Sequence, residues 1–322
     1  MSSSRASRRM LGAREGRGYH PQPGSGGGVA ASMRALALVV PLLALAACGT
    51  DAPTPDENGA RGRHERVEVE AGDAERFRAD LRLALGDVHT ARAARGLLFS
   101  ADADLPAGGL KLDAETEQAG DEVQLDLRLQ GEATRLRDLG RGVDWVLAFS
   151  DETPLDLRLD LGAARADLDL GGLPFSALTL RSGAAQAEIE FSEPAPTPLP
   201  VLDVEAGAST LRLSRLGNAR AERLRFRGGV GTFSLDLSGA PPEPGAEVDV
   251  KVGVARLDLA LPRGGPLVLD VPRSFAAAVS LPEGLTTLGG GRYASPEADG
   301  EAAPYAVRLR SGPGRVRVRW AE

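Results

Sequence analysis

A single thiol is the most specific chemical group in this sequence. Cys48 is the only cysteine in 322 residues. A lone cysteine cannot form an internal disulfide, so the mature fold must stand without one. The thiol must therefore serve another purpose, and the residues beside it indicate which.

The residues before Cys48 have the pattern of an export signal. Arg34 supplies a positive charge, and residues 35–47 form an apolar run that ends in small side chains. This run is too short to cross a bilayer, which needs roughly 20 apolar residues. Residues 45–48, Leu-Ala-Ala-Cys, resemble the lipobox of bacterial lipoproteins. The resemblance implies cleavage before Cys48 and a thioether-linked lipid on its sulfur; the alternative is a chance cysteine ending an ordinary signal peptide.

Composition divides the chain into four segments. Residues 1–32 are rich in Ser, Gly and Arg, and we expect either a disordered extension or a mis-called stretch upstream of a true start at Met33. Residues 33–47 read as a lipoprotein signal peptide and residues 48–65 as a flexible tether. Residues 66–322 then form one folded domain. We expect it outside the cytoplasm, anchored to a bacterial membrane through Cys48, and to the outer membrane if the cell has two.

The charge of the exported part excludes one class of partner. Residues 1–48 hold six Arg and one Glu, so residues 49–322 carry 32 basic and 44 acidic side chains and a net charge of −12. Such a domain is repelled by nucleic acid and by anionic lipid headgroups. We therefore expect no nucleic-acid partner.

The sequence contains few of the motifs that enzymes use for catalysis. His64 lies in the expected tether, and His89 has no second histidine at metal-ligand spacing. No Gly-x-Ser-x-Gly elbow or phosphate-binding loop is present. Residues 228–236, GGVGTFSLD, are only distantly similar to a calcium-binding nonapeptide and read better as a strand corner. Aromatic residues are 4% of the chain, which argues against a sugar-binding cleft. We expect no catalytic residues, metal or cofactor.

Four carboxylates are the one ambiguous group. Asp167 and Asp169 align with Glu188 and Glu190 if the two segments are neighbouring strands. Strands about 4.8 Å apart would bring these like charges together, and calcium could bridge them. The simpler interpretation is a solvated face whose repulsion is relieved by Arg158, Arg181 and Arg212.

The elements that must hold these side chains are strands with corners. In residues 155–170, LDLRLDLGAARADLDL, leucines alternate with polar residues up to Gly162, and the apolar positions then change from odd to even. Strand side chains alternate between the two faces of a sheet, so this change of parity requires a bulge or corner. We expect the glycine there to supply backbone angles that other residues avoid.

The same event recurs along the chain. It falls at Gly162, Gly183, Gly207, Gly229, Gly253 and Gly312, and the first five are 21, 24, 22 and 24 residues apart. A unit of two strands and a glycine corner repeating every 21–24 residues predicts a parallel β-solenoid, in which stacked coils share a core. The alternative is an antiparallel β-sandwich. The strands of residues 67–153 are expected to begin or cap the same stack.

The order of these segments resembles the toast-rack domain, which is related to the C-terminal domain of LiaF-type cell-wall-stress proteins. The likeness lies in the Gly corners and Leu-Asp-Leu strands of residues 66–263, and more loosely extends to Trp320. It implies a β-helical fold outside the cytoplasm and no established catalytic residues. We therefore predict a non-enzymatic, lipid-anchored envelope protein that acts as a scaffold, sensor or partner-binding module for an unknown envelope protein. The alternatives are a polysaccharide-active β-helix enzyme and a surface adhesin.

Overall fold

The computed structural model describes residues 62–106, 109–131, 142–242, 245–272, 277–299 and 305–321. Cys48 and the predicted extension and signal peptide lie outside these residues. Within them, no helix combines the length and apolar character needed to span a membrane.

The described residues form one continuous sheet of 18 strands. The first nine strands are β1 (Arg63–Glu70), β2 (Arg76–Arg92), β3 (Leu97–Leu105), β4 (Lys111–Ala119), β5 (Glu122–Gln130), β6 (Asp144–Phe149), β7 (Leu155–Asp169), β8 (Phe175–Ser182) and β9 (Gln186–Glu190). The others are β10 (Leu199–Ser214), β11 (Ala221–Asp236), β12 (Glu247–Leu261), β13 (Leu267–Asp270), β14 (Ala277–Ser280), β15 (Thr286–Gly289), β16 (Arg292–Ala294), β17 (Tyr305–Ser311) and β18 (Gly314–Trp320). Two short 3-10 helices are η2 (Leu216–Ala219) and η3 (Pro296–Asp299).

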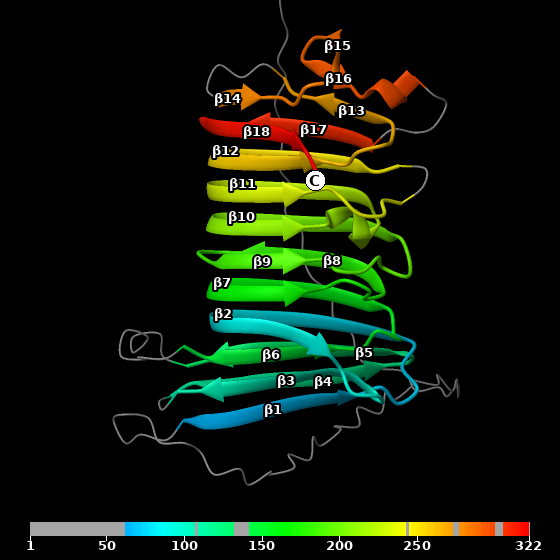
Figure 1. Ribbon diagram of the computed structural model, residues 1–322. Helices are drawn as coiled ribbons and strands as arrows, with labels where there is room; N and C mark the ends of the chain where they lie inside the picture. Colours follow the sequence, from blue (N-terminus) through cyan, green and yellow to red (C-terminus); the bar gives the residue numbers. More distant parts are fainter. Residues whose placement is uncertain are drawn as a thin grey trace, which may run out of the picture. The chain divides into compact units, whose positions relative to one another are not determined.

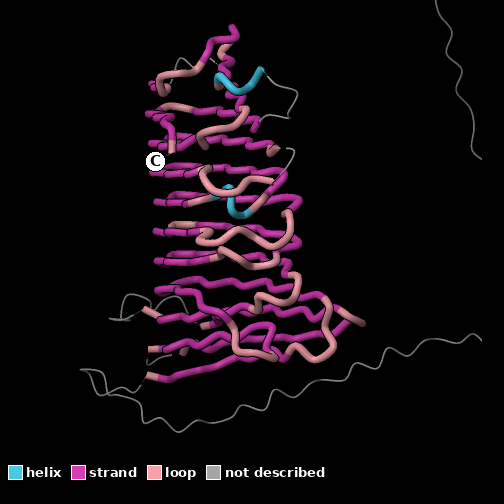
Figure 2. The backbone as a smooth tube through the Cα atoms, turned by 45° about the vertical axis from the view of Figure 1, so that its right-hand side comes forward, coloured by secondary structure: helices cyan, strands magenta, loops and turns pink. Residues whose placement is uncertain are grey.

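The central strands stack as parallel coils, each bent once (Figure 1). The part of each coil before its corner pairs with the same part of the next coil, and these parts form what we call the first wall. The parts after the corners form the second wall, so β10 pairs with β8 in the first wall and with β9 in the second. Loops close the third side between coils, as the tube of Figure 2 shows. These parallel pairings confirm the predicted β-solenoid and exclude the antiparallel sandwich for the central stack.

The core lies between the two walls. In β7 the buried positions are Leu155, Leu157, Leu159 and Leu161 before the corner, and Ala164, Ala166 and Leu168 after it. Burial thus changes parity at Gly162, as the sequence predicts, because a corner leaves two successive residues outside the core. Each fully buried leucine contributes about 1.5–3 kcal/mol to the free energy of unfolding. Repeated in every coil, this pattern holds the stack together.

At each end of the stack, one coil lies between two others that do not precede and follow it in the sequence. At one end β2 lies between β7 and the pair β5/β6. At the other end β17 and β18 lie between β12 and the pair β13/β14. Segments distant in sequence therefore cover the edges that β7 and β12 would otherwise expose.

The outermost strands near the N-terminus are antiparallel caps. β1 pairs with β3, β3 with β6, and β4 with β5. The prediction that this half of the domain caps the stack is confirmed. The edge strands β1 and β4 read RHERVEVE and KLDAETEQA, and such charged edges discourage pairing with another sheet.

Candidate functional site

The outer surface of the second wall presents a ladder of polar side chains. Three residues after its corner glycine, each of three successive coils places Gln186, Thr210 or Thr232 at one register position. Two residues further on, Glu188, Arg212 and Ser234 share a second position. These side chains face outward because strand residues alternate between core and solvent.

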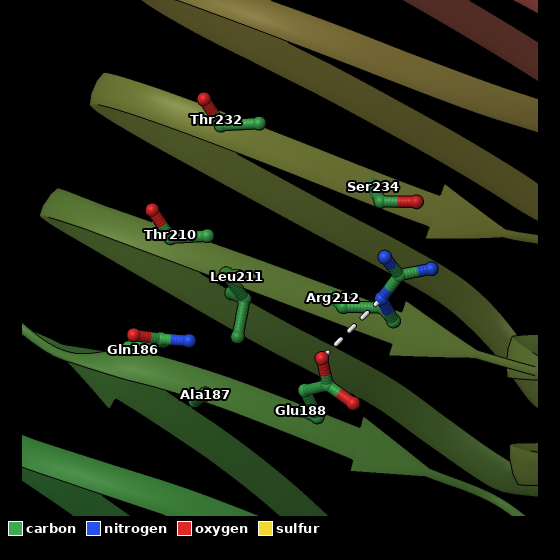
Figure 3. Close-up of a pocket in the computed structure, with 8 residues that line it drawn as sticks. All are labelled: Gln186, Ala187, Glu188, Thr210, Leu211, Arg212, Thr232 and Ser234. Atoms are coloured by element: carbon green, nitrogen blue, oxygen red, sulfur yellow. Dashed lines mark ion pairs between the residues drawn. The ribbon is translucent and has the colours of Figure 1, made fainter.

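A small hollow lies among these residues (Figure 3). Its volume is about 80 Å³, and buried Ala187 and Leu211 lie on the inward-facing positions between the polar ones. The guanidinium Nε of Arg212 lies 3.6 Å from Oε1 of Glu188 on the neighbouring coil. An amide, three hydroxyls and an ion pair can hydrogen-bond a partner, but they do not form a nucleophile with an adjacent base.

The four carboxylates come together as the sequence predicts, but most are already engaged. Asp167 pairs in register with Glu188, and Asp169 pairs with Glu190. Glu188 contacts Arg212, and Glu190 accepts a hydrogen bond from Arg215. No group of three potential metal ligands is found among the described residues.

Asp169 serves the local backbone. Its Oδ1 accepts hydrogen bonds from the amides of Gly171 at 3.0 Å and Ser192 at 3.1 Å. Partial burial alone would raise the pKa of Asp169, but the hydrogen bonds from Ser192 and Gly171 outweigh it and hold the pKa below its ordinary value. The geometry therefore favours a structural role for this carboxylate over cation binding.

Two of the three arginines expected beside these carboxylates lie elsewhere. Arg158 and Arg181 are on the first wall, where Arg158 lies 3.7 Å from Asp80 and Arg181 lies 3.3 Å from Glu205. The prediction was wrong for both, because residues on opposite sides of a corner belong to different walls. Arg212 alone is placed as predicted.

The histidines also differ from expectation in one case. His64 lies on β1 rather than in a tether, with Nδ1 2.9 Å from Asp104 and Nε2 3.2 Å from Asp102. The first described strand thus begins at Arg63, inside the segment assigned to the tether. His89 is exposed on β2 and pairs in register with Asp167.

The corner glycines form a column along the solenoid axis. A Cβ on Gly207 would lie 2.7 Å from the carbonyl oxygen of Gly183, and one on Gly229 would lie 2.8 Å from that of Gly207. Corresponding contacts continue at Gly162, Gly183, Gly253 and Gly312. None of the six has a positive φ, so the expectation of unusual backbone angles was wrong. Glycine is needed here because the backbone of the neighbouring coil approaches too closely for a side chain.

The stretch at 228–231 is a corner of the same kind. Residues 221–236 form β11, and a Cβ on Gly228 would meet the Phe233 ring at 2.5 Å. Gly231 has φ +156° and lies against the carbonyl of Ser209. Packing therefore accounts for these glycines.

Sequence reasoning missed the first position of the polar ladder, which Gln186, Thr210 and Thr232 occupy. A signal was present, because each follows its corner glycine by three residues. The shared position becomes apparent when the repeats are aligned by their outward-facing polar residues instead of their apolar ones.

Comparison with known proteins gives one family match. The model of a family described as the N-terminal domain of toast_rack matches residues 57–201. No curated protein sequence matches the chain. A candidate cell adhesion protein from Clostridium sporogenes superposes with a TM-score of 0.41 at 13% identity, covering 81% of this chain and all of that one. A candidate adhesin from Bacteroides fragilis gives 0.37 at 10% identity, covering 80% and 97%.

Proposed function

Because residues 57–201 of this chain match the model of the toast-rack N-terminal domain, we propose that the protein is a non-enzymatic component of the bacterial cell envelope or cell surface. Its solenoid acts as a partner-binding scaffold. The partner is another envelope protein, bound on the outer surface of the second wall.

The polar ladder is the observation that carries this proposal. The ladder offers amide, hydroxyl, carboxylate and guanidinium groups at a regular coil spacing. They lie on strands that are held rigid by backbone hydrogen bonds to the coils on either side. The hollow of about 80 Å³ is far smaller than the roughly 300–1,000 Å³ of small-molecule sites. A broad, regular surface of hydrogen-bonding groups suits a protein partner better than a substrate.

Attachment to the membrane is the second part of the proposal. The lipobox-like residues 45–48 support a lipid on Cys48, and the first described strand begins at Arg63. The 14 residues at 49–62 would span at most roughly 50 Å if extended. The anchored domain would therefore work close to the membrane.

Cross-linking from matched positions tests the binding surface. Thr232 and Arg225 are both exposed on β11, but Thr232 lies on the second wall and Arg225 on the first. A photoreactive amino acid at position 232 should give a discrete cross-linked species in living cells, whereas one at 225 should not. Equal cross-linking from both positions, or none from 232, would contradict the proposed surface.

A further inference from the structure

A ridge of exposed apolar residues runs along the corners of the solenoid. Each corner glycine is followed by an apolar residue; in chain order these are Ala163, Ala184, Ala208, Val230, Val254 and Pro313. We call these six residues the corner ridge. It follows the edge of Figure 1 where β10, β11 and β12 bend.

The ridge is most apolar at the C-terminal coils. The side chains there enlarge from Ala to Val, and Val230 and Val254 are 58% and 55% exposed. These two valines are neighbours in register. They border a wide, open hollow of about 600 Å³ that is also lined by Arg256, Ala278 and Arg315. Large apolar side chains exposed side by side on a rigid edge indicate an interaction surface.

Positive charges flank this end of the ridge on both walls. On the first wall Arg227, Lys251 and Arg310 occupy one register position in three adjacent coils. On the second wall Arg256 pairs in register with Arg315. Like charges directly opposite each other on neighbouring strands are destabilising, so these columns have an energetic cost for the isolated fold.

Only part of this charge is neutralised within the protein. Arg227 contacts Asp203 and Glu205, and Arg310 lies 3.8 Å from Asp249. Ion pairs among the described residues leave Lys251, Arg256 and Arg315 without a carboxylate partner. This end of the ridge therefore carries a local excess of positive charge, although residues 49–322 as a whole carry a net charge of −12.

We propose that the C-terminal end of the corner ridge docks on an anionic phospholipid surface. Val230 and Val254 enter the headgroup region, while Lys251 on one side and Arg256 and Arg315 on the other contact lipid phosphates. Anionic membranes attract clustered Lys and Arg, and exposed apolar residues add to that attraction.

The shape of the ridge favours a membrane over an acidic protein. The ridge is an outer bend of the chain, so a planar, deformable surface can contact both of its flanks at once. The strands that carry Val230 and Val254 are paired with neighbours on both sides, so these two valines do not lie on a free strand edge to which a peptide could add. The inference rests on the proposed envelope location but not on lipidation of Cys48.

The single cysteine makes a direct test possible. In the full chain carrying Cys48→Ser, Val254→Cys is labelled with an environment-sensitive dye. We expect its emission to rise and shift to the blue with vesicles of phosphatidylcholine and phosphatidylglycerol, but not with phosphatidylcholine alone. Added salt should reverse the change, because it screens the cations. The same dye on Thr116→Cys, exposed on β4 at the other end of the stack, should not respond.

A charge-matched pair of variants identifies the residues. Replacing Lys251, Arg256 and Arg315 with Ser should weaken binding to the anionic vesicles at least ten-fold. Replacing the exposed Arg95, Arg165 and Arg223 with Ser changes the net charge equally and should weaken it much less. Thermal melts of both variants report that the fold is kept.

Several results would overturn the proposal. A dye at 254 that does not respond to anionic vesicles would exclude insertion of the ridge. Equal loss of binding in both triple variants would make the attraction one of net charge only. A dye that responds to soluble polyglutamate but not to vesicles would assign the ridge to an acidic polymer. Because all measurements use Cys48→Ser, their failure leaves the lipid-anchor proposal standing.

Discussion

The carbonyl oxygen of Gly183 lies 2.7 Å from the position that a Cβ atom on Gly207 would occupy. The backbones of adjacent coils therefore touch at the corner, and the amide of Ala208 donates a 2.9 Å hydrogen bond to the same oxygen. The contact explains why a glycine recurs at these six corners although none of the six glycines has a positive φ. Glycine is required at the corner because the backbones of two neighbouring coils approach each other closely.

The glycine column predicts a graded loss of stability. Gly207→Ala should lower the free energy of unfolding by about 1–3 kcal/mol, since the methyl group must push the Gly183 carbonyl away. Gly183→Ala should cost less, because its Cβ would lie 3.2 Å from the Gly162 oxygen. Gly265→Ala is the control, since that Cβ would meet nothing within 4 Å. Denaturant melts that rank the three variants differently would contradict the close-approach explanation.

Most of the central stack could be predicted from sequence because its signal is local. The parity change at Gly162 and the spacing to Gly183 fix the register Asp167↔Glu188 without any knowledge of distant segments. The pairing of Glu188 with Arg212 follows from the same alignment. The spacing of the corner glycines and the alternation of apolar positions are properties of short segments, so both can be recognised in the sequence alone.

The ends of the stack could not be predicted in the same way. β2 enters between β5/β6 and β7, and β18 enters between β12 and β14. Such pairings join segments far apart in the chain, and an alternating strand pattern does not say which neighbour it selects. The charge of the ridge was hidden for a similar reason, because Lys251 and Arg310 are neighbours only after β17 has been placed on β12.

A buried asparagine should stabilise the loop side of the coils. Asn218 is 7% exposed; its Nδ2 donates to the Phe191 carbonyl at 2.8 Å, and its Oδ1 accepts from the Ala240 amide at 3.0 Å. Asn218→Ala leaves both backbone groups without these partners and should cost about 2 kcal/mol or more. Gln118→Ala, which removes an exposed side chain on β4, should change stability by less than about 0.5 kcal/mol. Equal melting of the two variants would show that the asparagine is dispensable.

The carboxylates of the second wall should act as surface charge. Asp167→Asn relieves repulsion from Glu188 and should stabilise the domain by a few tenths of a kcal/mol at low salt, an effect that added salt removes. Calcium should not change the melting temperature of the wild type, because Asp169 and Glu190 are engaged by Ser192 and Arg215. A calcium-dependent rise of several degrees that Asp167→Asn abolishes would establish a calcium site instead.

Asp169 should make the domain sensitive to acid. Its pKa in the folded state lies below the ordinary value, so its contribution is fully present above the pKa of the unfolded chain and is lost as the pH falls through the folded pKa. Melts at falling pH should show the stability gap between wild type and Asp169→Ala closing in the acid range. Asp73→Ala, in the turn before β2, is the control. A gap that stays constant from neutral to acid pH would contradict the hydrogen-bonded carboxylate.

The thiol of Cys48 should decide whether membrane association survives high salt. A thioether lipid holds the protein by apolar transfer of its chains, which salt does not weaken, whereas the cations of the corner ridge are screened within about 3 Å at 1 M salt. Wild-type protein should therefore stay with membranes after a wash in about 1 M salt, and Cys48→Ser should either be released by that wash or accumulate with its signal peptide uncleaved. Thr50→Ser, just beyond the lipobox-like residues, should behave as wild type. Mature Cys48→Ser protein that remains on salt-washed membranes would rule out the lipid anchor, because neither the ridge nor a cleaved chain could hold it there.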